Sequence, residues 1–498
     1  LYTISKDEIV EHFSSIPFVN GSLFECLDKT KGNDGVGKAF YYDGFSRNDH
    51  RIPATNHYRY RAFVPNNLFF DPDRGLFSIF GRYNFTIEEN TPLEQQVALD
   101  PELLGKVFEN LLGVYNPETK ETARKQSGSF YTPREIVDYM VDETLISYLG
   151  DTKLVRNLFS ESFVYNELDW AEYQNIAAKL KTVKILDPAC GSGAFPVGML
   201  NRIVEILGKL KTDRGDVFKL KRHIIENCIY GSDIQCIAAQ ITKLRFFISL
   251  IVNCERDEEK PNFGIPELPN LETKFVAANS VIGVSKLSGD GGMLEDPGVI
   301  AITEELRQVR HDHFNANTAA RKRRLVKRDA ELRKKLYDRL NGNLYQPEDA
   351  WKLAEWNPYD QNTSATFFDP EWMFGIKTGF DIVIGNPPYI KEYENRNAFD
   401  VFRDQSPYYM GKMDLWYGFA CIGIDLLKPD GQLCFIAQNN WTTSAGAAKM
   451  RTKVLEDVRI ISLLDFNDYK IFESAGIQTM VMLFKKGRDN ACYTFKQY

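Results

Sequence analysis

FDIVIGNPPYI, residues 380–390, joins a near-continuous apolar run to the tetrapeptide Asn386-Pro387-Pro388-Tyr389. An apolar run of this length is typical of a strand buried in a parallel sheet, and ligands bind at the carboxyl ends of such strands. Asn and Pro are also common in ordinary turns that end a strand, so the tetrapeptide alone does not require a function. Its position after a buried strand favours a functional site.

The tetrapeptide has the groups needed to activate a planar NH2 group. The lone pair of such an amine, in adenine or in an amide, is delocalised into the π-system. The nitrogen is therefore a poor nucleophile until two acceptors hold its N–H bonds out of plane. Asn386 supplies a side-chain carbonyl. Pro387 supplies a backbone carbonyl whose direction is restricted by Pro388, and Tyr389 offers a ring face for stacking.

The composition is that of a globular protein in a reducing compartment. The chain has 498 residues, enough for two or more domains, and 43% of them are hydrophobic. Its net charge of -7 gives no overall attraction for nucleic acid, so any DNA contact must be local or lie outside this chain. Eight cysteines without a CxxC pair predict free thiols and a cytosolic location.

The sequence predicts no membrane span, signal peptide or metal site. No run approaches the ~20 apolar residues of a membrane helix, and no secretory leader is visible. His311 and His313 are too isolated to predict a metal site. Because the first residue is Leu1 rather than Met, we expect the chain to be an excised or processed piece.

Strand-like and helix-like segments alternate along the second part of the chain. The strand-like segments are VKILD (183–187), IYGSDI (229–234), KFVAANS (274–280), FDIVIGN (380–386), GQLCFIAQNN (431–440), VRIISLLDF (458–466) and TMVMLFKK (479–486). Helices are predicted from about Ala194 and up to about Val252. The last strand is close enough to YTFKQY (493–498) to form a hairpin with it. The alternation predicts an α/β fold with a doubly wound, mostly parallel sheet and a terminal antiparallel hairpin.

The domain organisation follows from where this alternation begins. The predicted regions are 1–127, a mainly helical connector; 128–498, the sheet domain; and 285–375, a helical insertion within that domain. The clearest helix of the connector opens at Asp100-Pro101, an N-cap followed by Pro in the first turn. The sheet domain opens with GSFYTP, in which Thr132 and then Glu135 predict a capping box for a helix that ends near Leu149.

The insertion carries a charged helical stretch, residues 303–340. Within it lie the basic run RKRR (321–324) and the pair KR (327–328). A basic helix can contact phosphates. Such runs are more often solvated faces or helical hairpins, and this second interpretation is favoured here.

DPACGSGAF, residues 187–195, follows a strand and opens a helix, so its glycines let the backbone approach a ligand at a helix N-terminus. It differs from the dinucleotide fingerprint, because the third glycine is missing and an acidic residue precedes the loop. Asp187 suits a cationic ammonium group better than a pyrophosphate. Asp233, at the end of the next strand, is placed either to accept hydrogen bonds from ribose hydroxyls or to cap the following helix.

DPACGSGAF followed by GNPPY resembles the S-adenosylmethionine-dependent adenine-N6 DNA methyltransferases. The order of motifs, with GSFYTP first, then the cofactor loop, then NPPY, is similar to that of their γ group, in which the DNA-reading domain comes last. The longer match, roughly Tyr83 to Lys486, resembles type IIG modification–restriction fusions and type I modification subunits. The resemblance implies a seven-stranded methyltransferase sheet. It also implies methyl transfer from S-adenosylmethionine to a flipped adenine in double-stranded DNA, within a prokaryotic, cytoplasmic restriction–modification system.

The resemblance also assigns site residues. The cofactor-binding set is Tyr131, Thr132, Asp187, Pro188, Ala189, Gly191, Gly193, Asp233, Ile234 and Asn279, and the catalytic set is Asn386, Pro387, Pro388, Tyr389 and Phe472. Tyr131 and Thr132 are expected near the methionine carboxylate. Asp233 and Ile234 are expected at the ribose and adenine of the cofactor, and Asn279 at the same adenine. The loop residues that begin at position 187 would surround the methionine and ribose.

Phe472 is expected to pack on the flipped base, with an ordinary core phenylalanine as the alternative. The chain departs from the family at both ends. Only residues 487–498 follow the last strand, so the target-recognition domain is expected to be absent. No PD…ExK nuclease motif precedes Gly128, so a nuclease domain would lie upstream of Leu1.

Two other functions remain open at this point. Enzymes that methylate glutamine amides of release factors, or exocyclic amines of RNA, also use NPPY, because those groups are planar amines too. A catalytically silent DNA-binding or specificity module would also keep the fold. The GSFYTP motif and the helical connector favour DNA adenine as the substrate.

Overall fold

The computed structural model describes most of the second part of the chain. The described residues are 14, 17, 19, 67–76, 78–79, 84–86, 96–98, 115–116, 121–122 and 132–488, except 212–215, 285–296, 341–346 and 473–476. The chain divides into two compact units, Leu1–Val19 with Leu104–Tyr498, and Asn20–Leu103. The helix predicted to open at Asp100 and the predicted site residue Tyr131 lie outside the described residues. The predicted domain boundary after residue 127 stays a prediction.

Short elements precede the main sheet. In the smaller unit, α2 spans Asn67–Phe70, and β1 (Asn84–Thr86) pairs in parallel with β2 (Gln96–Ala98). In the larger unit, β3 (Tyr115–Asn116) pairs with β4 (Glu121–Thr122) in antiparallel orientation.

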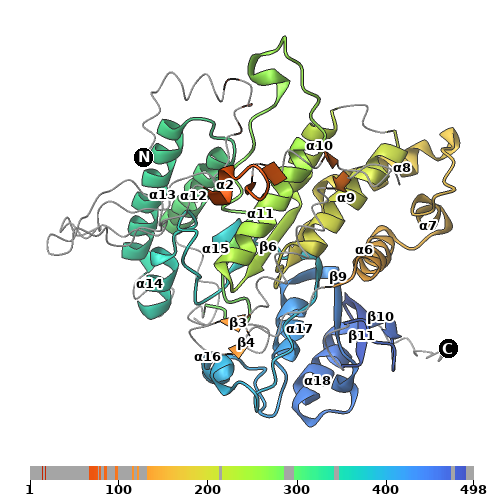
Figure 1. Ribbon diagram of the computed structural model, residues 1–498. Helices are drawn as coiled ribbons and strands as arrows, with labels where there is room; N and C mark the ends of the chain where they lie inside the picture. The colour runs from red at the N-terminus through yellow and green to blue at the C-terminus, as the bar shows by residue number, and fades with distance from the viewer. Residues whose placement is uncertain are drawn as a thin grey trace. The chain divides into compact units, whose positions relative to one another are not determined.

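A seven-stranded sheet forms the centre of the larger unit (Figure 1). Its strands are β5 (Ile185–Asp187), β6 (Ile229–Asp233), β7 (Phe275–Ala277), β8 (Phe380–Gly385), β9 (Leu427–Gln438), β10 (Val458–Asp465) and β11 (Thr479–Lys486). The order is β10-β11-β9-β8-β5-β6-β7, and the four pairings from β9 to β7 are parallel. The predicted α/β class and mostly parallel sheet are confirmed.

The chain reverses its direction across the sheet between β5 and β8. From β5 it proceeds outward through β6 to β7, and it then returns to place β8 on the other side of β5. Ile185 lies opposite Ile382, and Leu186 lies opposite Val383, so the two strands end side by side. A reversal of this kind leaves a crevice at the carboxyl ends of the two strands, where α/β proteins bind ligands.

The terminal hairpin has a different partner from the one predicted. β11 pairs in antiparallel orientation with β10 on one side and with β9 on the other. Both edges of β11 are therefore occupied, and the predicted partner YTFKQY (493–498) lies outside the described residues. The hairpin is formed instead by β10 and β11: the buried apolar run of β11 fits a strand with a neighbour on each side, and β10 is the edge strand.

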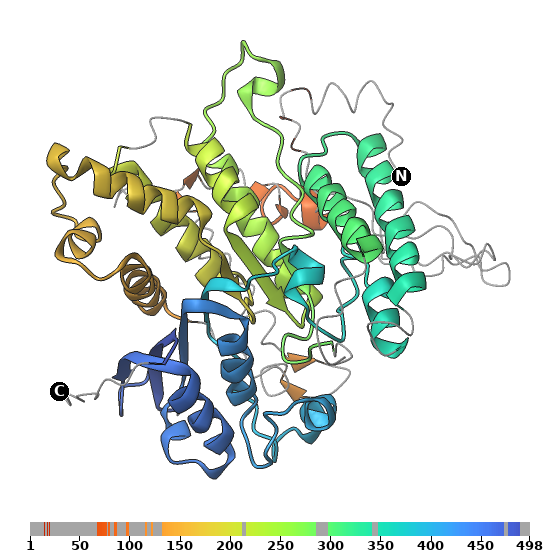
Figure 2. The same cartoon turned by 180° about the vertical axis from the view of Figure 1, so that it is seen from behind.

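Helices cover the sheet on both faces (Figures 1 and 2). The helices of this part of the chain, some of which pack on other helices, are α6 (Arg134–Leu149), α7 (Lys153–Leu158), α8 (Trp170–Thr182), α9 (Ala194–Lys209), α10 (Val217–Asn227), α11 (Cys236–Ile251), α16 (Asp400–Gln405), α17 (Leu415–Leu426) and α18 (Ala448–Asp457). α11 packs on β6 and β7, whereas α17 and α18 pack on β8, β9 and β10. Residues 431–438 of β9 are all buried, as expected of a strand with cover on both faces.

The insertion forms a group of helices on the side of the sheet where β7 is the edge strand (Figures 1 and 2). They are α12 (Pro297–Phe314), α13 (Ala319–Leu340), α14 (Pro347–Glu355) and α15 (Pro370–Phe374). α12 and α13 pack against each other as the predicted helical hairpin. Between them, the buried carboxylate of Asp329 accepts from Arg310 Nε (2.9 Å) and Arg333 Nε (2.7 Å). Most of the basic run, including Arg321 and Arg324, is exposed, and a phosphate contact there stays a prediction.

The six cysteines of the described residues are free thiols. Among the helices that the structure describes, none combines the length and the apolar character that crossing a membrane would require.

Candidate active site

The loop between β5 and α9 has a backbone that only glycine adopts easily. Gly191 has φ 53° and Gly193 has φ 87°, both in the left-handed region. A Cβ on Gly193 would also lie 2.8 Å from the Thr242 methyl carbon, well inside contact distance. Both predicted glycines are therefore required for the turn, and Gly193 is also required for the close approach of α11.

Two side chains of α11 hold this loop in place. Thr242 donates its hydroxyl to Gly191 O (3.0 Å), and Arg245 donates Nη1 to Ser192 O (2.9 Å). Arg245 is 2% exposed, so its guanidinium makes its hydrogen bonds to buried protein groups and not to solvent. Sequence reasoning missed both residues. Their signal is weak, a Thr and an Arg three positions apart in a mainly apolar helix that also contains other polar residues.

Asp187 lies at the end of β5, and only one of its two carboxylate oxygens accepts a hydrogen bond from the described residues. Oδ1 accepts from the Ala189 N–H (3.1 Å), whereas Oδ2 finds no hydrogen-bond partner among the described residues. The side chain is 1% exposed. Burial, and to a smaller extent the neighbouring Asp233, raise the pKa of Asp187 well above its usual range. A buried acceptor of this kind fits a cationic donor on a ligand.

Asp233 has a role inside the loop. Its Oδ2 accepts from the Gly191 N–H (2.9 Å), and its Oδ1 accepts from the Gln235 N–H (2.8 Å). The alternative of a simple helix cap is wrong in detail, because α11 begins at Cys236 and its N-cap is Gln235. Asp233 therefore links the cofactor loop to the turn before α11, and its predicted ribose contact stays a prediction.

The residues predicted to hold a nucleobase lie at the ends of β6 and β7. Ile234 follows β6 and is 60% exposed, which is unusual for an isoleucine beside a buried strand. Asn279 follows β7 and is half-buried, and its N–H donates to Ala365 O (2.9 Å). Ser280, which sequence reasoning missed, donates its hydroxyl to Pro188 O (2.6 Å) and so ties the end of β7 to the cofactor loop.

Asn386 is held on both ends of its side-chain amide. Its Nδ2 donates to the Thr132 hydroxyl (3.1 Å), and the Tyr389 hydroxyl lies 2.6 Å from its Oδ1. The same tyrosine hydroxyl lies 3.0 Å from Ile436 O on β9. Burial raises the pKa of Tyr389 well above its usual range, so the hydroxyl stays protonated and donates. The amide therefore has a fixed orientation, and a carbonyl oxygen has a second lone pair to offer.

The predicted capping box does not form. α6 begins at Arg134, and its N-cap is Pro133, with φ -56° and ψ 149°, which makes no side-chain cap bond. Thr132 precedes a proline, which favours an extended backbone, and its hydroxyl accepts from Asn386 instead of capping the helix. The predicted end of the helix at Leu149 is confirmed, with Gly150 in the left-handed conformation after it.

We expect Thr132→Val to lower kcat for methyl transfer about tenfold and to leave cofactor affinity nearly unchanged. Valine keeps the shape of the 4% exposed threonine but removes the acceptor for Asn386 Nδ2, a bond of about 1 kcal/mol. Thr132→Ser keeps the hydroxyl and is the matched control. Steady-state kinetics with both variants measure the effect. A fall in cofactor affinity at constant kcat would instead favour the predicted contact with the methionine carboxylate.

Phe472 and Tyr389 are brought together, as the catalytic set requires. Their ring centroids are 6.2 Å apart with an interplanar angle of 63°, an edge-to-face contact. Phe472 is 4% exposed. An ordinary core phenylalanine makes the same contact, so packing of Phe472 on a flipped base stays a prediction.

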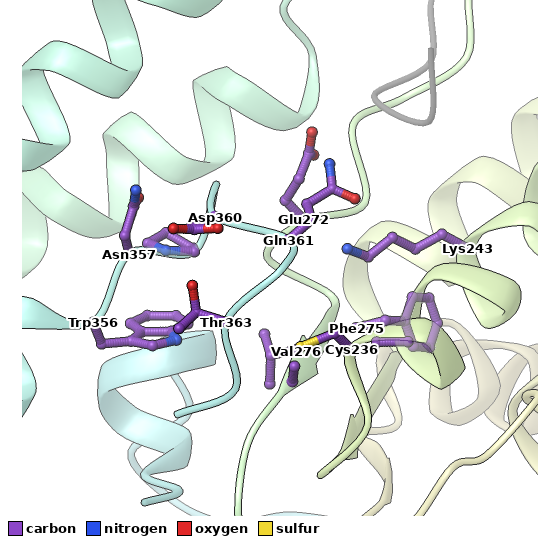
Figure 3. Close-up of a pocket in the computed structure, with 13 residues that line it drawn as sticks. Cys236, Lys243, Glu272, Phe275, Val276, Trp356, Asn357, Asp360, Gln361 and Thr363 are labelled. Atoms are coloured by element: carbon purple, nitrogen blue, oxygen red, sulfur yellow. The ribbon is translucent and has the colours of Figure 1, made fainter. Parts of the chain in front are cut away.

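A small cavity lies beside the start of α11, between β7 and residues 356–363 (Figure 3). Lys243, Glu272 and Gln361 point toward it. Its volume of about 20 Å³ is enough for one water molecule. Burial lowers the pKa of Lys243, although Glu272 opposes this effect. The cavity lies next to the ends of β6 and β7, where the cofactor is predicted to bind, and its volume is too small to hold a cofactor.

Asp414 is a buried acid next to the NPPY loop that sequence reasoning missed. It precedes α17, and it forms a backbone bridge with Lys391, two residues after Tyr389. The side chain is 4% exposed. Burial raises the pKa of Asp414 to about 7, and the nearby Lys391 ammonium opposes the rise only in part.

Asp414→Asn is expected to flatten the pH dependence of stability. A carboxyl whose folded pKa of about 7 exceeds its unfolded value of 3.8 contributes stability in full below pH 3.8, and loses it as the pH rises through 7. Urea denaturation at about pH 5 and about pH 8 measures this: the wild type should lose more unfolding free energy than the variant. The same pH dependence in both proteins would contradict the assignment.

Comparisons with known proteins agree with this geometry. The N-6 DNA Methylase family model matches residues 99–262, and the Eco57I restriction-modification methylase model matches residues 227–472. Between them they include both the cofactor loop and the NPPY strand. The chain carries an adenine-N6 DNA methylase domain. It is of the type IIG-like kind found in restriction–modification enzymes.

Individual relatives of this methylase domain are distant in sequence. The chain is 25% identical over 511 residues to the putative type II restriction enzyme and methyltransferase RM.MjaORFECS2P of Methanocaldococcus jannaschii, covering 87% of this chain and 42% of that protein. It is 22% identical over 325 residues to the type II restriction enzyme and methyltransferase RM.Eco57I of Escherichia coli, covering 62% and 25%. The chain thus spans less than half the length of these relatives.

Among solved structures, the type IIL restriction-modification enzyme MmeI in complex with DNA aligns with 80% of this chain and 41% of its own. The TM-score is 0.43 and the sequence identity is 12%.

Proposed function

We propose that the methylase domain transfers a methyl group from S-adenosylmethionine to the N6 amine of an adenine flipped out of double-stranded DNA. One observation carries the proposal: the start of the cofactor loop and the end of the NPPY strand are in contact, with no side chain between them. A Cβ on Gly385, the residue before Asn386, would lie 2.7 Å from Asp187 Oδ1. The acid of the cofactor loop and the amide of the NPPY strand therefore share one crevice, where a donor and an acceptor of a methyl group can lie in line.

The residues present fit S-adenosylmethionine. The cofactor has an ammonium group, and Asp187 Oδ2 is a buried acceptor with no hydrogen-bond partner among the described residues. Gly191 and Gly193 let the loop approach the ligand closely, and the exposed Ile234 offers an apolar surface for the cofactor adenine. When bound, the sulfonium supplies the methyl group. Asp233 and Asn279, at the ends of β6 and β7, are proposed to contact the ribose and the adenine ring.

In the proposed reaction, Asn386 Oδ1 and Pro387 O accept hydrogen bonds from the two N–H bonds of the adenine N6 amine. These acceptors favour the localised lone pair that develops as the amine attacks. The methyl group that the cofactor would supply would pass to the amine nitrogen, and the amine would lose one N6 proton to solvent. The fixed amide of Asn386 needs no reorientation during this step, because Thr132 and Tyr389 hold it beforehand.

Radiolabelled methyl transfer by the full-length protein to DNA, RNA and protein, tested side by side, checks the proposal. We expect label on the N6 of adenine in DNA. Label on protein or RNA alone would overturn the proposal in favour of a glutamine-amide or RNA-amine methyltransferase. Absence of label on all three, with DNA binding retained, would indicate a silent specificity module.

The wider role of the protein is also a proposal. The two relatives described above are named restriction enzyme and methyltransferase, and each is longer than this chain. We assign most of the recognition of the DNA sequence, and any cleavage, to parts of the whole protein other than the methylase domain, in a prokaryotic cytoplasm. Residues 128–498 form the catalytic domain in this arrangement, and residues 1–127 the connector.

A further inference from the structure

A second pocket lies at the carboxyl end of β9, beside the loop that joins β10 to β11. Its volume is about 350 Å³, within the range of sites for small ligands. We call it the amide pocket, because its lining includes Gln438, Asn439, Asn467, Asp468, Lys470 and Gln478. The proposed methyl-transfer chemistry uses none of these residues.

Two of the amides are held so that their carbonyls are the available ends. Asn439 Nδ2 lies 3.1 and 3.2 Å from the two carboxylate oxygens of Asp465. Gln478 Nε2 donates to Asp468 Oδ1 (2.8 Å). Because the NH2 end of each amide is engaged, the pocket offers carbonyl acceptors to a ligand. Acceptors of this kind bind N–H donors, and exocyclic amines of nucleobases are such donors.

The β10–β11 loop adds a cation and a ring. Lys470 is exposed and is one of the lining residues, so its ammonium can pair with a phosphate. The two aspartates of the pocket region face amide N–H groups, which reduces their repulsion of a phosphate. Tyr469, between two lining residues, is 71% exposed. An exposed tyrosine gives a base a face on which to stack.

The amide pocket adjoins the proposed base site. Phe472 is two residues beyond Lys470 on the same loop, and Ile436, which the Tyr389 hydroxyl contacts, is two residues before Gln438 on β9. Gln438 itself is 6% exposed, so other residues pack closely around this end of the strand. A nucleic-acid strand whose flipped base reaches the Tyr389–Phe472 ring pair would pass next to the pocket.

We propose that the amide pocket binds a second nucleotide of the substrate strand, with a base that carries an exocyclic amine. This rests on the proposed function, because it takes DNA as the substrate. The carbonyls of Asn439 and Gln478 accept from the base amine, and Lys470 pairs with the phosphate. Adenine, cytosine and guanine meet this requirement, and thymine does not.

Binding of short single strands to the full-length chain tests the proposal. Fluorescence anisotropy at one fixed salt concentration compares labelled pentadeoxycytidylate with labelled pentathymidylate. Neither strand contains adenine, and the same comparison in Asn386→Ala, which lacks the catalytic acceptor for an exocyclic amine, excludes binding of cytosine at the catalytic pocket as the source of the preference. We expect the cytidylate strand to bind about tenfold more tightly. Equal affinity of the two strands would overturn the proposal.

Variants separate the base contact from the phosphate contact. Gln478→Met is expected to reduce the tenfold preference nearly to one. Gln308→Met is the matched control, because Gln308 Nε2 also donates to an aspartate, Asp312 Oδ1, on the exposed face of α12. Lys470→Gln should weaken both strands equally and reduce the slope of log affinity against log salt by about 0.7. A preference that survives Gln478→Met in a protein that melts normally would overturn the assignment.

The outcomes also separate this proposal from the proposed function, because binding is measured without methyl transfer. Equal affinity of the wild-type protein for the two strands, with methylation of DNA intact, would overturn the pocket assignment alone. A preference for cytidylate in a protein that methylates no DNA would overturn the proposed function alone.

Discussion

Asn386→Ala lowers kcat for methyl transfer about 10²- to 10³-fold, while the affinity for S-adenosylmethionine stays close to that of the wild type. The alanine removes the carbonyl oxygen that accepts from the adenine amine in the transition state. We expect it to leave Asp187 and the cofactor loop in place, because Asn386 Nδ2 donates to Thr132 and Asn386 Oδ1 accepts from Tyr389. A split of this kind, with kcat lost and cofactor binding kept, identifies an interaction made in the transition state.

Asn386→Asp is the matched control for this prediction. Aspartate keeps an acceptor oxygen for the amine and can still accept from the Tyr389 hydroxyl, but it has no N–H for the Thr132 hydroxyl. We therefore expect it to retain more activity than the alanine variant. Single-turnover transfer with saturating cofactor measures both. Wild-type kcat in Asn386→Ala would remove Asn386 from the chemistry and, with it, the proposed mechanism.

The parts of the site that sequence reasoning located are those with local causes. Gly191 and Gly193 adopt left-handed conformations within a single loop, and such positions can be read from a strand–glycine–helix pattern. The strand before Asn386 is equally local, since residues 382–384 are fully buried and apolar. The mostly parallel α/β sheet followed from the same patterns, because apolar strand runs alternate with helices over the whole sheet domain, whereas the order of the strands was not predicted.

The parts that it missed depend on contacts between distant segments. The bond from Asn386 to Thr132 joins residues 254 positions apart, so a threonine that resembles a helix cap in the sequence is used for another purpose in the fold. Thr242 and Arg245 are polar positions in an apolar helix, and their role appears only when α11 is packed on the cofactor loop. The two neighbours of β11, β9 and β10, likewise could not be predicted, because β9 is distant from β11 in the sequence and pairs with it only in the folded sheet.

Asp187→Asn is expected to have opposite effects on binding and on stability. The affinity for S-adenosylmethionine should fall about 10- to 100-fold, because a charge-assisted bond to the ammonium group is lost. The unfolding free energy at about pH 8 should rise by about 1–3 kcal/mol, because a buried acid that burial disfavours is replaced by a neutral amide. Calorimetric titration and urea denaturation of the apoprotein measure the two quantities.

The sign of the stability effect follows from the pKa of Asp187. Its folded pKa is raised well above 3.8, so its contribution to stability is full at low pH and is lost as the pH rises through the folded value. The gain in Asp187→Asn should therefore shrink on acidification. Asp216→Asn is the matched control, because Asp216 caps α10 from an exposed position by accepting from the Phe218 N–H, and asparagine caps a helix equally well. If Asp187→Asn weakened binding and also destabilised the apoprotein at pH 8, the acid would be a structural support of the loop. If Asp187→Asn instead gains stability and loses affinity, the buried carboxylate of Asp187 destabilises the fold and is kept because it binds the ligand.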